Sequence, residues 1–243
     1  MGDYRFFNIP RSCEVKNTIF KKLFYENADL STADQKLFTE VINKITWLFC
    51  LKPETINLQP YRDEIREYEE LEIIEVEITA EKKINRLAEI IMRTIPYPMV
   101  LIFRLHDQVK FYAAHQRSSL QDNTKNTIEE FISTDWLEQD NPLFAKLDLQ
   151  KMRFTNFYAL YSDIVDTISI ANVTGLIPST AALSGEEARQ LSSGLETLEQ
   201  EIIALRARLK KETQFNRKME LNIAIKKLEQ EKRNLMGEFA KTL

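Results

Sequence analysis

Glycine is scarce in this chain, which has five glycines among its 243 residues. A phosphate-binding P-loop needs the pattern GxxxxGK[ST] and a dinucleotide-binding fold needs GxGxxG, and neither pattern occurs. The GxSxG turn that presents a nucleophilic serine is also missing. We therefore expect no nucleotide cofactor and no serine-hydrolase chemistry of that type.

Cysteine and histidine are rarer still, with two of each. Cys13 and Cys50 lack CxxC spacing and lie in apolar stretches, so we expect two buried thiols rather than a disulfide framework or a zinc site. His106 and His115 stand at opposite ends of a predicted β-hairpin, where we expect ordinary surface side chains. These residue types therefore predict no metal.

A long apolar run is absent as well. No stretch reaches the roughly 18 apolar residues of a membrane-spanning helix, and the opening MGDYRFFNIP lacks the apolar core of a secretion signal. We therefore expect a cytoplasmic protein. The balance of 33 basic and 37 acidic residues gives a net charge of −4, which argues against a dedicated nucleic-acid-binding protein.

Charge and composition divide the chain near residue 180. Residues 186–243 hold 12 basic and 10 acidic side chains, which leaves 21 basic and 27 acidic in the remainder, and every proline precedes residue 179. We predict a globular α+β body over residues 1–180, with a helical N-terminal extension, and a C-terminal coiled coil over residues 185–243. Residues 178–185 would form the joint.

The body has the pattern of a βαββ sheet with helices packed on it. Residues 73–79 alternate apolar and charged side chains, which predicts a strand with one wet face. After it we expect, in order, a helix at 81–94, strands at 99–103 and 109–114, an edge strand at 127–132 and a helix at 154–171. In the N-terminal extension, apolar residues from Leu37 to Phe49 predict a helix that Pro53 ends.

A heptad seam follows in the tail. Its first part has the 4, 3, 4, 3, 4 spacing of a coiled coil and comprises Leu191, Leu195, Leu198, Ile202, Leu205 and Leu209. Its second part includes Leu221, Ile225 and Leu228. The two parts are 12 residues apart and out of phase, so the tail is either one long helix or an antiparallel helical hairpin. The seam must be covered by its own second arm, by a second copy in a homo-oligomer, or by a protein partner.

One enzyme hypothesis is a small magnesium-dependent nuclease. Such a site needs carboxylates and a lysine gathered at a sheet edge, where they bind the ion and activate water. The candidates are Asp63, Glu75, Glu77, Glu81 and Lys83. The competing interpretation is that the whole stretch 63–83 is a solvated charged face.

A second site hypothesis concerns nucleic acid. Basic residues cluster at the middle of the tail: Arg206, Arg208, Lys210, Lys211, Arg217 and Lys218. In a hairpin they would gather at its tip, where they could contact phosphates. The competing interpretation, which we favour, is that they are solvated charges flanking a coiled coil.

Five short segments together resemble a known bacterial family. They are FNIP at 7–10, IFKKLFY at 19–25, KPETINL at 52–58, IPYP at 95–98 and QFNRKMELN at 214–222. As a set they resemble domain-of-unknown-function family 4391 over nearly the whole chain. The resemblance implies genes that often lie beside DNA helicases of the type III restriction kind and adenine-specific DNA methyltransferases. It assigns no catalytic residue.

The leading hypothesis is therefore a non-catalytic accessory subunit of a bacterial restriction-modification or phage-defence system. It would act by protein–protein interaction, binding a DNA helicase or methyltransferase that supplies the chemistry. The alternatives are the magnesium nuclease and a DNA-gripping subunit that uses the basic middle of the tail.

Overall fold

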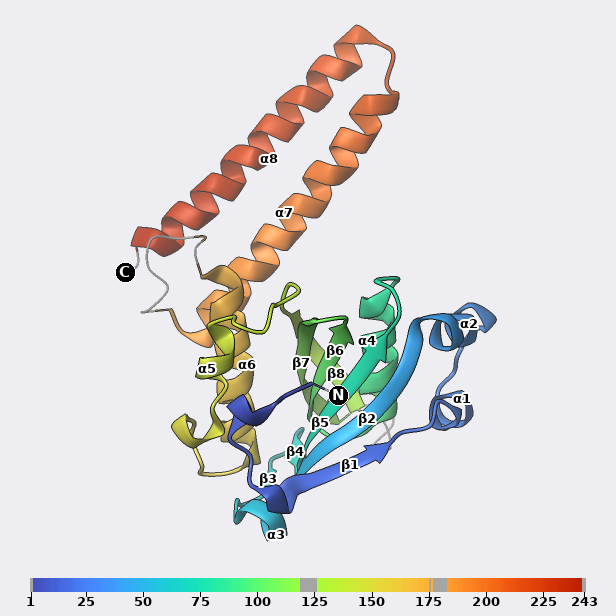
Figure 1. Cartoon of the computed structure of the whole chain (residues 1–243). Coiled ribbons are helices and arrows are strands. Elements are labelled where there is room, and N and C mark those ends of the chain that lie inside the picture. Colours follow the sequence, from blue (N-terminus) through green and yellow to red (C-terminus); the bar gives the residue numbers. More distant parts are fainter. Residues whose placement is uncertain (1, 119–125, 175, 177–182, 242–243) are drawn as a thin grey trace. The chain divides into compact units, whose positions relative to one another are not determined.

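The computed structural model describes residues 2–118, 126–174, 176 and 183–241 (Figure 1). The chain divides into two compact units, Met1–Ile168 and Ser169–Leu243. The division falls inside helix α6 (Phe157–Val173) rather than near residue 180, and most of the predicted joint at 178–185 lies outside the described residues. No helix in the described part is long and apolar enough to cross a membrane.

A six-stranded mixed sheet forms the centre of the first unit (Figure 1). In spatial order its strands are β1 (Glu14–Thr18), β2 (Ile42–Leu51), β5 (Leu71–Ile78), β6 (Met99–Leu105), β7 (Gln108–Ser118) and β8 (Asn126–Ser133). All neighbours are antiparallel except β5 and β6, which helix α4 (Ile84–Thr94) connects as a parallel crossover. The predicted βαββ order is confirmed.

The N-terminal extension contains helices as predicted, but the helix expected from Leu37 to Phe49 ends at Val41. Helix α2 (Thr32–Val41) begins after Ser31, whose hydroxyl accepts the Asp34 N–H at 3.1 Å, and the chain then continues directly as β2. An apolar run of this kind fits a buried strand as well as a helix. Pairing decides the outcome, because β2 lies antiparallel to β5 with Ile45 opposite Val76.

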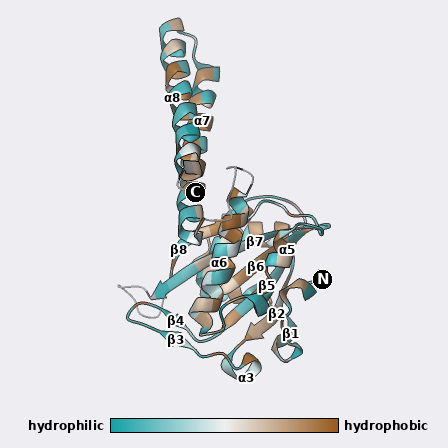
Figure 2. Cartoon of the chain, turned by 90° about the vertical axis from the view of Figure 1, so that its left-hand side faces the viewer, coloured by the Kyte–Doolittle hydropathy of each residue, from teal (hydrophilic) through white to brown (hydrophobic). Residues whose placement is uncertain are grey.

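Both faces of β5 are covered, so the predicted wet face was also wrong. On one face Ile74 and Val76 pack in a core with Leu87 and other residues of α4. On the other face Glu75 is buried beside the N-terminal residue Tyr4, whose hydroxyl donates to it at 2.7 Å. Colouring by hydropathy shows brown and teal segments in the sheet, with β8 largely hydrophilic (Figure 2).

Shorter elements complete the first unit. The helices are α1 (Lys22–Asn27), α3 (Pro53–Ile56) and α5 (Leu143–Lys146), with single 3-10 turns at Arg5–Phe7, Arg11–Cys13 and Leu149–Lys151. Strands β3 (Tyr61–Arg62) and β4 (Glu67–Tyr68) form a separate two-stranded hairpin. The predicted edge strand and the long helix after it are present as β8 and α6.

The second unit contains two long helices, α7 (Gly185–Lys211) and α8 (Phe215–Lys241), which lie side by side and antiparallel (Figure 1). The side chain of Arg206 pairs with Glu229 at 2.8 Å, and Lys232 pairs with Glu199. Residues 212–214 connect the helices without glycine or proline. The Glu212 carboxylate accepts the backbone N–H groups of the next two residues, at 2.8 and 2.9 Å, and so stabilises the turn. A supercoil along this helix pair stays a prediction.

Candidate functional site

The predicted seam residues lie between the two helices of this pair. Leu191, Leu195, Ile202 and Ile225 are buried. The others, Leu198, Leu205, Leu209, Leu221 and Leu228, are partly buried. The chain's own second arm therefore covers much of the seam. A protein partner that used the seam itself would have to separate α7 from α8.

A different apolar surface is exposed on α8. Phe215, Met219 and Ile223 are 73%, 49% and 63% exposed. Their spacing of four residues places them on one face of the helix. At about 100° per residue this face is roughly 120–200° around the axis from the seam, so it points away from α7. We call these three residues the apolar stripe. The heptad analysis missed the stripe because it followed the seam, although the i, i+4, i+8 spacing was a signal in the sequence.

The surroundings of the apolar stripe are strongly basic. Residues 206–227 contain eight basic and two acidic side chains, a net charge of +6. Of these eight basic side chains, two form ion pairs within the described part of the chain: Arg206 with Glu229 at 2.8 Å, and Lys227 with Glu231 at 3.8 Å. The predicted basic cluster thus gathers where α7 ends and α8 begins. A depression of about 370 Å³ there is lined by Arg208, Glu212, Arg217, Glu220, Leu221 and Ala224.

Two of the nuclease candidates, Glu75 and Glu77, meet a common arginine. Arg104 on β6 donates to Glu75 at 3.1 Å and also pairs with Glu77. Burial alone would raise the pKa of Glu75, but hydrogen bonds from Tyr4 and Gly2 and the charge of Arg104 hold that pKa below its usual value. The two carboxylates thus share one cation of the protein itself.

The other three nuclease candidates lie in different surroundings. Asp63 sits in the β3–β4 turn, where it accepts backbone N–H groups from Ile65 at 2.8 Å and Arg66 at 2.6 Å. Glu81 and Lys83 are exposed before α4. Among the described residues, the one group of three or more potential ligands close enough to hold an ion includes none of the five candidates. The structure does not gather them into the predicted magnesium site.

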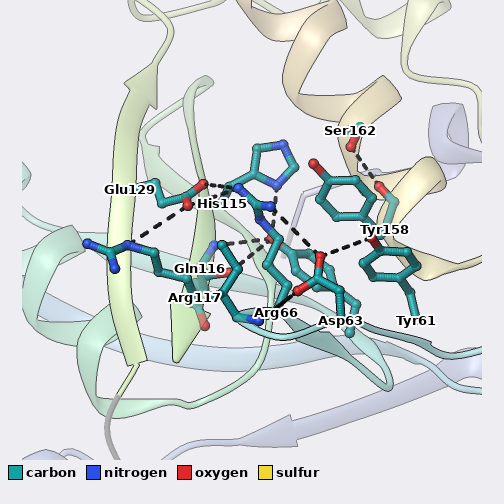
Figure 3. Close-up of polar contacts among 11 residues, drawn as sticks. Tyr61, Asp63, Arg66, His115, Gln116, Arg117, Glu129, Tyr158 and Ser162 are labelled. Atoms are coloured by element: carbon teal, nitrogen blue, oxygen red, sulfur yellow. Dashed lines mark hydrogen bonds and ion pairs between the residues drawn. The ribbon is translucent and has the colours of Figure 1, made fainter. Parts of the chain in front are cut away.

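A polar and aromatic network surrounds the β3–β4 hairpin (Figure 3). Arg66 donates to both oxygens of Glu129 on β8, at 3.0 and 3.2 Å, and its guanidinium lies 5.5 Å from the centre of the Tyr158 ring. Tyr68 and the Nδ1 atom of His115 share a hydrogen bond of 2.9 Å. His115 is thus a partly buried network residue rather than the predicted surface side chain. The network ties the hairpin to β7, β8 and α6, which is a structural role.

A cavity of about 800 Å³ lies in the first unit between its N-terminal segment and the β6–β7 turn. His106 lines it from that turn and is exposed, as predicted. Its arginines are already paired, since Arg5 lies 2.5 Å from Asp3 and Arg104 binds Glu75. The cavity therefore offers no uncompensated cation for an anionic ligand among these residues.

Cys50, Glu70 and Glu72 form the group that could hold a metal ion, with potential ligand atoms all within 4.8 Å of one another. Sequence spacing could not reveal this group, because 20 residues separate Cys50 from Glu70. Strand pairing assembles it, since Cys50 lies opposite Glu72 in the register of β2 and β5. Both cysteines are free and buried, as predicted.

Comparison with known proteins identifies the family. No curated protein and no solved structure matches the chain. The family model described as Domain of unknown function (DUF4391) matches residues 7–231. The chain therefore belongs to the DUF4391 family.

Proposed function

We propose that this protein is a non-catalytic accessory subunit that binds a protein partner through the apolar stripe of α8. The observation that carries this proposal is the exposure of Phe215, Met219 and Ile223 on a face that α7 does not cover. Exposed apolar side chains that form a continuous stripe mark an interaction surface. A groove that receives one helix face with i, i+4, i+8 anchors is a common recognition mode.

Charge defines the partner further. The net charge of +6 over residues 206–227 favours a groove with an acidic rim, because complementary charges speed association and fix orientation. We propose that this groove belongs to a DNA helicase or DNA methyltransferase of a bacterial restriction or phage-defence system. The partner would supply ATP hydrolysis and the chemistry on DNA, and the complex would act in the cytoplasm.

The stripe can supply a substantial part of the energy of specific binding. Burying a large apolar side chain contributes about 1.5–3 kcal/mol. Weighted by the exposed fractions of Phe215, Met219 and Ile223, the stripe can contribute about 3–6 kcal/mol. Because 1.4 kcal/mol is a factor of ten in affinity, its removal should weaken binding at least about a hundredfold.

Co-expression with a DNA helicase and a DNA methyltransferase of a bacterial restriction system tests this proposal. The test variant is Phe215→Ser, Met219→Ser and Ile223→Ser combined. The control variant combines Gln230→Ser and Arg233→Ser, which change the polar continuation of the same helix face. We expect the wild type and the control to co-purify with one of these enzymes and the stripe variant to lose it. Equal recovery with the stripe variant, or no recovery with the wild type, would contradict the proposal.

A DNA-gripping role is the second candidate, and the basic residues around the depression favour it. In this case Arg208, Arg217 and their neighbours would contact phosphates, and affinity would fall steeply as salt rises. Duplex DNA binding by the wild type and by the Arg217→Ala, Lys218→Ala variant distinguishes the two functions. Loss of about two units from the slope of log affinity against log salt supports gripping. An unchanged slope excludes these two residues from DNA contact.

A further inference from the structure

Three potential metal ligands meet at the end of β2. Cys50 on this strand and Glu72 on β5 are direct partners in the strand register, and Glu70 lies immediately before β5. Their ligand atoms, one sulfur and two carboxylate oxygens, all lie within 4.8 Å of one another. A single ion can therefore contact all three after small side-chain movements.

Burial separates this group from an ordinary acidic surface. Cys50 is 7% exposed and Glu72 is 3% exposed, and Glu70 is partly buried. The indole N–H of Trp47 donates to Glu72, and the Cys50 sulfur lies 3.8 Å from a Glu70 oxygen. None of the ion pairs between described residues includes Glu70 or Glu72. A carboxylate this deeply buried either takes up a proton or needs a cation beside it, and none of the ion pairs between described residues supplies a cation to Glu72.

The electrostatic field within the group is negative. Burial, followed by the charges of Glu72 and Glu70, raises the pKa of the Cys50 thiol to about 12, while Lys52 opposes this shift. Burial also raises the pKa of Glu72 to about 7, against the hydrogen bond from Trp47. Charge on Glu70, burial and then Glu72 raise the pKa of Tyr97.

A cavity provides access to the same residues. It has a volume of about 470 Å³, and Glu70 and Glu72 line it together with apolar and aromatic side chains that include Trp47 and Tyr97. A metal ion held by three protein ligands keeps a fourth position for water or another molecule. The cavity has room for that fourth ligand.

We propose that Cys50, Glu70 and Glu72 form a binding site for a divalent cation of the zinc class. A thiolate ligand favours zinc over magnesium or calcium, which prefer oxygen ligands alone. The Trp47 N–H would hold Glu72 in place as a supporting hydrogen bond to a ligand. On binding, the Cys50 thiol releases its proton to solvent.

Cobalt is a suitable probe, because a thiolate bound to Co²⁺ gives a charge-transfer absorption band. The full-length protein would be titrated with Co²⁺ as wild type, as Cys50→Ser and as Cys13→Ser, which changes the other buried cysteine. We expect one ion per chain and the band in the wild type and in Cys13→Ser, with displacement by Zn²⁺ and not by Mg²⁺. Cys50→Ser should lose the band.

The Glu70→Gln variant tests the site without disturbing the fold, because Glu70 is only partly buried. With an unchanged circular dichroism spectrum, it should bind Co²⁺ at least tenfold more weakly than the wild type. Absence of the band in the wild type, or its persistence in Cys50→Ser, would overturn the site. The stripe variant should bind cobalt normally, so this test is independent of the proposed partner.

Discussion

Replacing Arg104 with methionine should destabilise the first unit by about 3 kcal/mol at pH 7. Arg104 is 18% exposed and contacts Glu75, whose side chain is 3% exposed. Breaking a buried ion pair by removing one partner costs about 3–5 kcal/mol. We expect the lower end of that range, because the Tyr4 hydroxyl at 2.7 Å and the Gly2 N–H at 2.9 Å continue to donate to Glu75.

The pH dependence of this effect has a defined sign. In the wild type the pKa of Glu75 is below its usual value, so its contribution to stability is present above the unfolded pKa and is lost as pH falls. In Arg104→Met the folded pKa of Glu75 rises relative to the wild type, because burial is then opposed only by the hydrogen bonds from Tyr4 and Gly2. The defect should therefore shrink as pH falls through the folded pKa of Glu75 in the variant, because Glu75 then becomes protonated.

Urea unfolding followed by tryptophan fluorescence measures this effect, since Trp47 and Trp136 both belong to the first unit. The control is the double variant Glu75→Gln, Arg104→Met, which removes the unpaired charge and should recover much of the lost stability. A single variant within about 0.5 kcal/mol of the wild type at pH 7 would refute the reasoning.

Three other predictions concern stability. Tyr161→Phe should cost about 1–3 kcal/mol in urea unfolding, because its fully buried hydroxyl accepts the Ala114 N–H at 3.0 Å and its loss leaves that group unpaired. Leu195→Asp should melt the helix pair, seen as lost ellipticity in circular dichroism, whereas Ile203→Asp, at a side chain 65% exposed, should not. The hydrogen bond from Arg86 lowers the pKa of Asp34 to about 2, so the wild type should lose this carboxylate's stabilising contribution as pH falls from about 4 to 2. Asp34→Asn lacks that contribution, so urea unfolding should show a smaller loss of stability over the same pH range.

Local patterns predicted the centre of the sheet well. The secondary structure of residues 73–79, 84–94 and 99–103 can each be predicted from the pattern of apolar residues within a short segment. The strand at 42–51 could not be predicted in this way, because its side chains suit a buried helix or a buried strand equally. Pairing with β5, about 30 residues later in the chain, decides its structure.

Candidate sites were harder to predict for a related reason. Nothing near Glu75 in the sequence shows that Arg104 neutralises it, and nothing near Cys50 shows that two carboxylates approach it. Both groups depend on strand register. The apolar stripe at 215, 219 and 223 is different, because it is local and could have been recognised from spacing alone.

Photo-crosslinking at the stripe is the most direct test of the central claim. Phe215 would be replaced by p-benzoylphenylalanine in cells that also express a DNA helicase and a DNA methyltransferase of a bacterial restriction system, with the same replacement at Gln230 as the control position. The proposal predicts an adduct at 215, resistant to nuclease, whose second component is the helicase or the methyltransferase. An adduct with nucleic acid alone, or none while both enzymes are present, would contradict it.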